Sequence, residues 1–202
     1  SGNVAEIIAV AAASVTGSPL PLLPLQILFL NFVLDVFPAL ALGMGEGAPE
    51  IMDRPPRSTK EPILARTHWG FIGSFGAVIA VTILLALYVA MSWLGMPHSQ
   101  AVTVSFLTLS FSRLLHIFNM RDTETHPLFN EITLNRYVSL ALLICVGLLL
   151  GSVYIPGISD VLSLQPPGVQ GWLTVIVLSL LPLIVGQLYK LIIGYRRKRN
   201  RT

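Results

Sequence analysis

The chain has 202 residues, a formal net charge of +3 and a mean hydropathy of +0.74. Charged residues make up only 11% of it, against about 25% in a typical soluble domain, and apolar residues reach 53%. This composition excludes an ordinary soluble globular domain. The sequence pI is 9.3, but the basic residues are gathered in loops and a tail rather than spread as a binding face. We therefore expect no nucleic-acid partner.

Long stretches without Asp, Glu, Lys or Arg predict membrane spans, because a helix needs about 20 apolar residues to cross a bilayer. The uncharged stretches are 7–34, 67–112, 137–159 and 161–189. Residues 1–16 are typical of the second part of a helix that ends at a Gly-Ser-Pro turn. Five spans are expected after it, at 21–43, 67–94, 100–120, 134–153 and 171–194. The fold class is all-α, a polytopic bundle of about six membrane segments with the first one truncated.

The loops divide by charge. Twelve of the thirteen Lys and Arg residues fall on one side of the predicted bundle, in the loops 44–66 and 121–133, at the adjoining span ends and in the basic tail 195–202. The positive-inside rule makes this side cytoplasmic. We expect residues 1–202 to form one multi-pass domain in the plasma membrane, with the lipid bilayer as its main partner.

Three charged residues lie inside predicted spans, where a charge costs about 2.5–3.5 kcal/mol and marks a functional site. They are Glu6, Asp35 and Arg113. Counting residues at 1.5 Å each places Asp35 and Arg113 about 12 Å from the cytoplasmic span ends. Glu6 lies about 16 Å from the turn at Gly17 on the opposite side, which leaves about 14 Å to the cytoplasmic side in a core of about 30 Å. Because the depths coincide, we expect one polar cluster.

Neighbouring residues add oxygen atoms to this cluster. Asn3 shares a helix face with Glu6, and Asn31 shares one with Asp35. Pro38 has no N–H group, so the carbonyl of Leu34 loses its helical partner. Carboxylate, amide and backbone oxygens suit a hard or small cation, and the absence of thiolate disfavours a soft metal.

Other interpretations of these residues remain open. Asp35 and Arg113 could form a purely structural ion pair, and either asparagine alone could make an interhelical hydrogen bond. His116, one turn after Arg113, is more typical of packing or hydrogen bonding than of a ligand. Cys145, the lone cysteine, is most simply a small packing residue.

Two segments resemble a known family. The stretch "LPLQILFLNFVLDVFPALALG", followed by "APEIMDRPPRSTKEPIL", resembles the sixth membrane helix and the next cytoplasmic loop of P-type cation-transporting ATPases, in the calcium-pump-like branch. "SGNVAE" resembles the ion-binding half of their fifth helix. The resemblance covers the whole chain, as the fifth to tenth helices, although the last four spans match mainly by pattern.

The resemblance implies roles for residues already singled out. Asn3 and Glu6 would be fifth-helix cation ligands, and Asn31 and Asp35 sixth-helix ligands. A transported cation, calcium first among them, would be the substrate. The loop at 44–66 would couple the membrane to the cytoplasmic phosphorylation domain; its residues of interest are Asp53, Arg54 and Arg57.

The same resemblance implies parts that this chain does not contain. The parent pump would have further helices and the actuator, phosphorylation and nucleotide-binding domains, which bring ATP and magnesium. No phosphorylation motif of the "DKTG" kind is present. We therefore expect no ATP hydrolysis by these residues alone.

Two positions depart from the family pattern. Calcium pumps with two sites usually have Thr before the sixth-helix Asp, where this chain has Leu34. Arg113 falls about where their eighth helix supplies a carboxylate. Arginine is a permanent cation and cannot ligate a metal. We hypothesise that Arg113 fills one site, so that at most one cation is transported, and proton transport by a carboxylate becomes plausible.

Two further function classes stay open from the residues themselves. One is a secondary transporter or channel in which an Asp/Glu–Arg pair relays protons or gates ions. The other is a structural membrane bundle that contains a buried ion pair. An upstream phosphorylation motif would favour the pump over both.

Overall fold

Every regular element that the structure describes is a helix. A computed structural model of the chain describes residues 1–44, 66–120 and 135–199. α1 (Gly2–Thr16) is followed by one continuous helix built from α2 (Pro24–Leu30), the π-helical segment η1 (Asn31–Asp35) and α3 (Val36–Gly43). The remaining helices are α4 (Arg66–Tyr88) with the π-helical extension η3 (Val89–Trp93), α5 (His98–His116) with the 3-10 turn η4 (Ile117–Met120), α6 (Arg136–Tyr154), the short α7 (Ile158–Val161) and α8 (Gly168–Arg199).

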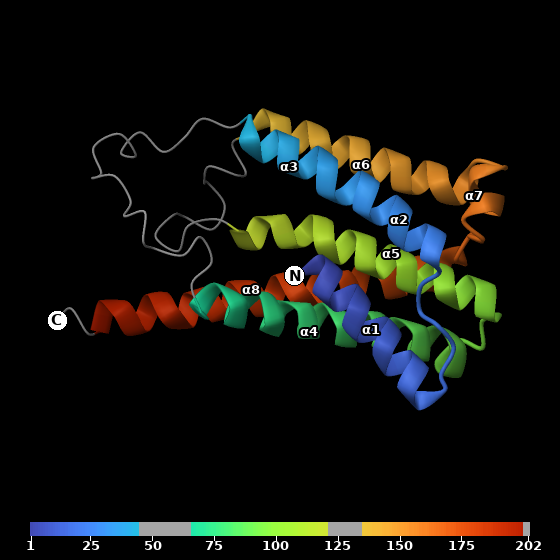
Figure 1. The fold of residues 1–202 in the computed structure, drawn as a ribbon, viewed down its shortest axis with the longest axis horizontal. Coiled ribbons are helices and arrows are strands. Elements are labelled where there is room, and N and C mark those ends of the chain that lie inside the picture. The colour runs from blue at the N-terminus through green and yellow to red at the C-terminus, as the bar shows by residue number, and fades with distance from the viewer. Residues whose placement is uncertain (45–65, 121–134, 200–202) are drawn as a thin grey trace.

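The helices run back and forth along one long axis (Figure 1). α3 and α6 lie side by side along one edge, α1, α4 and α8 lie along the other, and α5 runs between the two groups. Five helices in the described ranges are long and apolar enough to cross a membrane, and α1 is a shorter apolar helix. The predicted all-α, polytopic bundle is confirmed.

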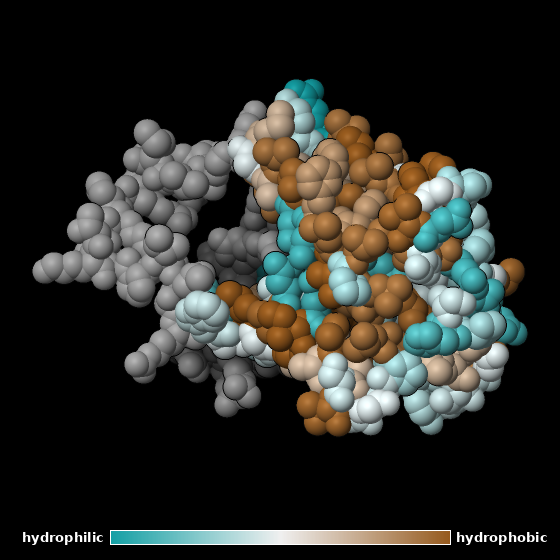
Figure 2. All heavy atoms as spheres, turned by 45° about the vertical axis from the view of Figure 1, so that its right-hand side comes forward, coloured by the Kyte–Doolittle hydropathy of each residue, from teal (hydrophilic) through white to brown (hydrophobic). Residues whose placement is uncertain are grey.

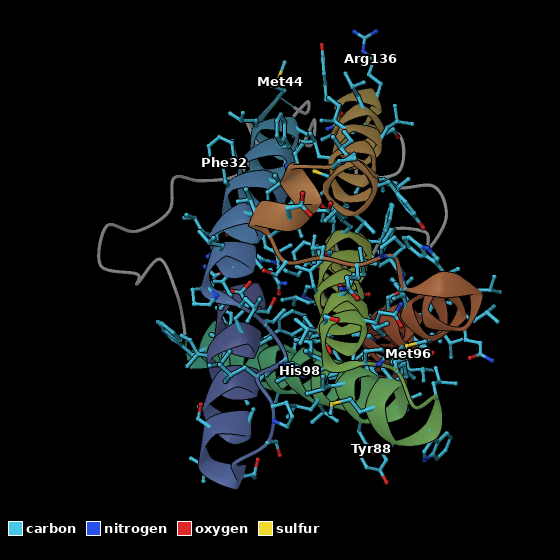
Figure 3. All side chains as sticks on the ribbon, turned by 90° about the vertical axis from the view of Figure 1, so that its right-hand side faces the viewer. Phe32, Met44, Tyr88, Met96, His98 and Arg136 are labelled. Atoms are coloured by element: carbon cyan, nitrogen blue, oxygen red, sulfur yellow. The ribbon has the colours of Figure 1, made fainter. Side chains whose placement is uncertain are left out.

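The outer surface of the bundle is suited to lipid. Figure 2 shows apolar side chains over much of the visible surface and hydrophilic ones gathered toward the end that carries α7. Large apolar side chains such as Phe32 and Tyr88 are mostly exposed and point away from the helices (Figure 3). In water such a surface would be unfavourable, but in a bilayer it is the expected lipid contact.

α5 is the central helix, and four polar side chains in its middle are shielded from solvent. Thr103, Ser105, Thr108 and Ser110 are completely buried. Each hydroxyl donates instead to the backbone carbonyl four residues earlier on α5, at 2.6–3.1 Å. This local bonding lets a helix of moderate hydropathy occupy the middle of the bundle.

The turn after α1 depends on one glycine. Gly17 adopts a left-handed conformation with φ 65°, and its N–H group caps carbonyls in the last turn of α1. Residues with a Cβ are strained in this conformation. The turn therefore ends α1 and directs the chain into α2.

The last helix is longer than the sequence indicates. α8 begins at Gly168 and continues to Arg199, whereas we expected a span over 171–194 followed by a separate tail. Lys and Arg are good helix formers, and positive charge favours a helix C-terminus. The basic segment therefore extends the helix through Arg199.

The segment before α8 is also more ordered than a simple loop. It contains α7, and the buried Gln26 of α2 donates to the carbonyl of Leu162 at 3.0 Å. The backbone N–H of Gln165 donates to Thr103 of α5 at 2.9 Å. The loops 17–20, 95–99 and 154–170 contain no Lys or Arg and form the non-basic end of the bundle. These two bonds connect that end to the spans that contain α2 and α5.

A π-helical segment, η1 (Asn31–Asp35), lies just before Pro38, which is itself in α3. Proline at 38 removes one N–H donor from the turn that contains Val33 and Leu34. The carbonyl of Val33 is approached by Sγ of Cys145 on α6 at 3.5 Å. Single π-helical turns of this kind often occur at functional sites. Here it carries Asn31 at one end and Asp35 at the other.

Candidate cation site

The guanidinium of Arg113 binds four side-chain oxygens. Its Nη1 donates to Oε1 of Glu6 at 2.5 Å and to Oδ1 of Asn31 at 3.3 Å. Its Nη2 donates to Oδ1 of Asn3 at 3.2 Å and to Oδ1 of Asp35. All four residues predicted as cation ligands thus meet at one point. The prediction of a single polar cluster is confirmed.

Three separate helices build this cluster. Asn3 and Glu6 lie on one face of α1, Asn31 and Asp35 flank the π-helical turn η1, and Arg113 projects from the last turns of α5. In Figure 1, α1 lies in one group of helices and α3, which continues directly from η1, lies in the other. Arg113 therefore bridges the two groups as well as binding the oxygens.

The charged side chains of the cluster differ in their exposure. The Arg113 side chain is 8% exposed and that of Glu6 5%, whereas that of Asp35 is 47% exposed. A buried charge is tolerated only when it is paired and hydrogen-bonded. Arg113 and Glu6 satisfy this condition for each other, and Asp35 presents its carboxylate to the surroundings.

With both carboxylates ionised, the cluster has one net negative charge, from two carboxylates and one guanidinium. Its oxygen set has the chemistry of a hard-cation site, although no group of three or more His, Cys, Asp or Glu occurs in the described residues. Arginine has five N–H donors and no lone pair for a metal. Its guanidinium therefore donates hydrogen bonds to oxygens that, without it, would be free to bind a cation.

Two residues predicted to modify the site add no side-chain oxygen to it. Leu34 is buried in the apolar core, and Pro38 is buried within α3. Their role as residues that modify the site stays a prediction. The coupling-loop residues Asp53, Arg54 and Arg57 lie outside the described residues, so their role stays a prediction.

A second buried polar cluster, missed by the sequence analysis, joins the end of α5 and the turn η4 to α8. The side-chain amide of Asn119 donates to the carbonyl of Pro182 at 3.0 Å and lies 3.2 Å from Nδ1 of His116. Gln187 donates to Oδ1 of Asn119 at 2.9 Å. A Cβ added at Gly186 would lie 2.3 Å from Cγ of Asn119. Pro182 and Gly186, four residues apart in an apolar span, were the available signal.

The contacts of His116 agree with the expected packing role. Its ring lies 4.8 Å from that of Phe75 on α4, and its side chain is buried. Cys145 is also buried, as expected for a packing residue. Neither side chain takes part in the cluster around Arg113.

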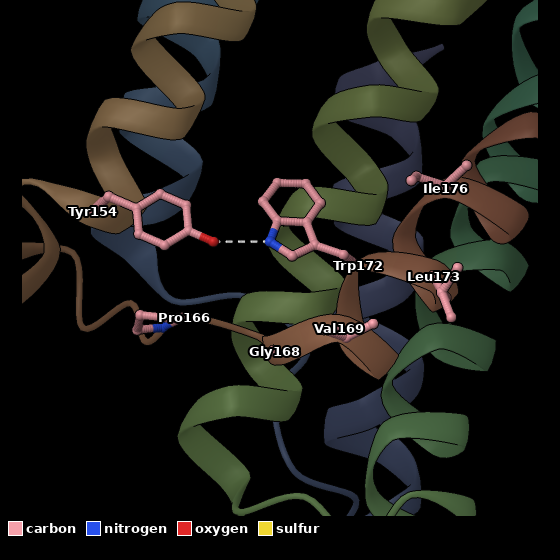
Figure 4. Close-up of a pocket in the computed structure, with 7 residues that line it drawn as sticks. All are labelled: Tyr154, Pro166, Gly168, Val169, Trp172, Leu173 and Ile176. Atoms are coloured by element: carbon pink, nitrogen blue, oxygen red, sulfur yellow. Dashed lines mark hydrogen bonds between the residues drawn. The ribbon is translucent and has the colours of Figure 1, made fainter.

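A groove of about 370 Å³ lies away from the charged cluster, between the ends of α6 and α8 (Figure 4). Nε1 of Trp172 donates to the hydroxyl of Tyr154 at 2.9 Å across it. Its other lining residues are mostly apolar. Paired Trp and Tyr side chains are typical of the membrane interface.

The fold is that of a multi-pass membrane helix bundle, and a charged cluster lies where α1, η1 and α5 meet. A family model described as "Cation transporting ATPase, C-terminus" matches residues 19–192. The chain belongs to this family, the C-terminal membrane region of the cation-transporting ATPases.

Relatives named as calcium-transporting ATPases extend this result. The Bacillus subtilis protein is 33% identical over 190 residues, which are 93% of this chain and 21% of that relative. The "Calcium-transporting ATPase 1" of Bacillus cereus is 31% identical over 95% of the chain and 23% of the relative. The protein of the same name from Lactococcus lactis is 33% identical over 85% and 19%. The chain thus spans about a fifth of the length of these relatives.

Proposed function

We propose that the chain is the cation-binding part of the membrane domain of an ATP-driven cation pump. Asn3, Glu6, Asn31 and Asp35 are the ligands of the transported cation in this proposal. The observation that carries it is the convergence of their four side-chain oxygens between α1, η1 and α5. Oxygens that accept hydrogen bonds from a guanidinium are also suitable ligands for a hard cation.

Arg113 acts in this proposal as a built-in cation. Its charge is permanent, and it takes one oxygen from each proposed ligand. An additional divalent ion among the same oxygens would lie close to the guanidinium and be repelled by it. We infer that Arg113 replaces one transported cation, so that at most one remains per cycle.

Calcium is the cation that we favour. Relatives named as calcium-transporting ATPases are about a third identical over most of the chain, and oxygen-only ligands fit calcium. Because Arg113 lowers the negative charge of the cluster, another small cation or a proton carried by Glu6 or Asp35 is the alternative. Membership in the ATPase family favours a pump over a secondary transporter or channel.

The rest of the pump supplies the ATP chemistry in this proposal. The relatives are between four and five times as long as this chain, and we assign the first helices and the actuator, phosphorylation and nucleotide-binding domains to the remainder. ATP and magnesium act there. A helix from that remainder would pack against the half-exposed Asp35 and complete the site.

The orientation in the membrane follows from charge. We propose that the basic helix ends and the loop 44–66 face the cytoplasm across the plasma membrane. In that loop, Asp53, Arg54 and Arg57 would transmit movement between the phosphorylation domain and the spans.

Neutralising the two carboxylates tests the ligand assignment. Glu6→Gln and Asp35→Asn in the full-length pump are each expected to weaken calcium activation of ATPase activity about tenfold or more, because each removes a charged ligand. Asp160→Asn is the matched control, since Asp160 lies exposed on α7. Unchanged calcium activation in both site variants would instead indicate a purely structural ion pair.

A further inference from the structure

Gly2 on α1 lies directly against the guanidinium of Arg113. A Cβ added at Gly2 would lie 2.5 Å from Nε of Arg113, 2.8 Å from Cζ and 3.1 Å from Nη2. Contacts under 3.0 Å require some atom to move. The absence of a side chain at Gly2 is therefore what leaves room for the guanidinium beside α1.

The guanidinium cannot move away without losing bonds. An arginine at the protein surface would swing aside at little cost, because its side chain is long and flexible. Arg113 is 8% exposed and is held by oxygens from α1 and η1 while its backbone belongs to α5. A displacement of a few tenths of an ångström lengthens several of these bonds together.

Helix preference gives no reason for a glycine at this position. Gly2 lies within the described range of α1, and glycine is the poorest helix former after proline. An alanine would favour the helix more. The close approach of Arg113 supplies the missing physical reason.

We propose that Gly2 is a positioning residue for Arg113 and sets how completely the guanidinium occupies the cation site. The proposal rests on the function proposed above. With any larger residue at position 2, the guanidinium is pushed off the α1 oxygens of Asn3 and Glu6, and these oxygens become more available to a transported cation. Gly2 and Arg113 thus act as one unit in determining cation binding.

Two other glycines provide controls for this mechanism. A Cβ at Gly76 of α4 would lie 2.8 Å from Cγ1 of Val4 on α1, so Gly76→Ala disturbs the contact between α1 and α4 without touching Arg113. A Cβ at Gly73 of α4 would meet nothing within 4 Å, so Gly73→Ala measures the effect of the exchange in open space.

A double-mutant cycle in the full-length pump tests the proposal. Gly2→Ala, Arg113→Gln and the double variant are compared by thermal unfolding without the cation and by the calcium concentration that half-activates the ATPase. Gly2→Ala alone is expected to lower the unfolding temperature. It should also lower the calcium concentration that half-activates the ATPase about threefold or more, because the α1 oxygens become more available and Gly2 and Arg113 are in contact. In the Arg113→Gln background both effects should disappear. Gly76→Ala should have the same effect in both backgrounds, and Gly73→Ala almost none.

The outcomes separate this proposal from the one on which it rests. Equal effects of Gly2→Ala in both backgrounds, or no effect in the wild type, would overturn the positioning role. If Gly2→Ala alone does not fold, the double variant should restore folding, and a double variant that also fails to fold contradicts the proposal. If the unfolding temperatures are coupled but calcium activation is unchanged in all three variants, Arg113→Gln included, the contact between Gly2 and Arg113 is supported and the proposed cation site is contradicted.

Discussion

Nη1 of Arg113 on α5 lies 2.5 Å from Oε1 of Glu6 on α1, and both side chains are almost completely buried. The pair joins two helices through residues that are 107 positions apart in the sequence. Each charge is tolerated in the bundle because the other is present. The interaction between these two residues is therefore both a structural link and the centre of the proposed cation site.

The two carboxylates are expected to differ in their contribution to stability. Glu6→Gln leaves the buried Arg113 with a weaker partner and should lower the free energy of unfolding by about 3 kcal/mol. Asp35→Asn should cost about 1 kcal/mol or less, because the Asp35 side chain is 47% exposed and exposed pairs contribute little. Thermal unfolding of this chain in detergent without calcium would compare them, because the exposure of Asp35 is that of residues 1–202 without the rest of the pump. An equal or reversed order would contradict the burial argument.

The polar cluster between α5 and α8 is expected to be structural. Asn119→Ala removes the donor to the Pro182 carbonyl and the acceptor for Gln187, and it should lower stability by about 2 kcal/mol. Calcium activation should stay within twofold of wild type, because these bonds lead to α8 rather than to the Arg113 cluster. A large change in calcium activation with unaltered stability would show that this cluster also takes part in transport.

Gln26 should be important for the non-basic end of the bundle. Its side chain is completely buried, donates to the Leu162 carbonyl and accepts from the Leu23 backbone N–H. Gln26→Ala leaves both backbone groups without this partner and should cost about 1–3 kcal/mol. Gln100→Ala is the control, since Gln100 makes a longer, exposed bond of 3.4 Å to the Pro166 carbonyl. Similar losses for the two variants would disprove the assignment.

The proposed orientation can be tested by cysteine labelling in intact cells. His98→Cys, at the non-basic end, should react with a membrane-impermeant maleimide from outside, whereas Arg136→Cys should react only after the membrane is opened. Both positions are exposed in the structure. The native Cys145 is buried, so the unaltered chain should give little background. Labelling of Arg136→Cys from outside would reverse the topology.

Much of the fold was predictable because the membrane simplifies the physics. The long uncharged stretches give the number of spans, and the distribution of Lys and Arg gives their alternation. The depths of Glu6, Asp35 and Arg113 predicted one cluster, and the hydrogen bonds of Arg113 confirm it. A charge inside a span must pair with polar groups at a similar depth. Counting residues along each span was therefore sufficient to predict which charges meet.

The features that sequence reasoning missed depend on which helices touch. The bond from Asn119 to Pro182 requires α5 and α8 to be neighbours, and no periodicity within one helix reveals that. Gly2 appears unimportant until Arg113 is placed against it. Pro38 indicated a local irregularity, but its form as a π-helical turn over Asn31–Asp35 depends on contacts with other helices.

The number of cations transported per ATP tests the central claim most directly. Arg113→Glu in the full-length pump, reconstituted in vesicles, should raise the ratio of calcium transported to ATP hydrolysed above the wild-type value, because a ligand then replaces the built-in charge. Arg136→Gln, which removes an exposed arginine outside the site, should leave the ratio unchanged. A ratio that is identical in wild type and Arg113→Glu, with calcium transport intact, would contradict the claim that Arg113 takes the place of a cation.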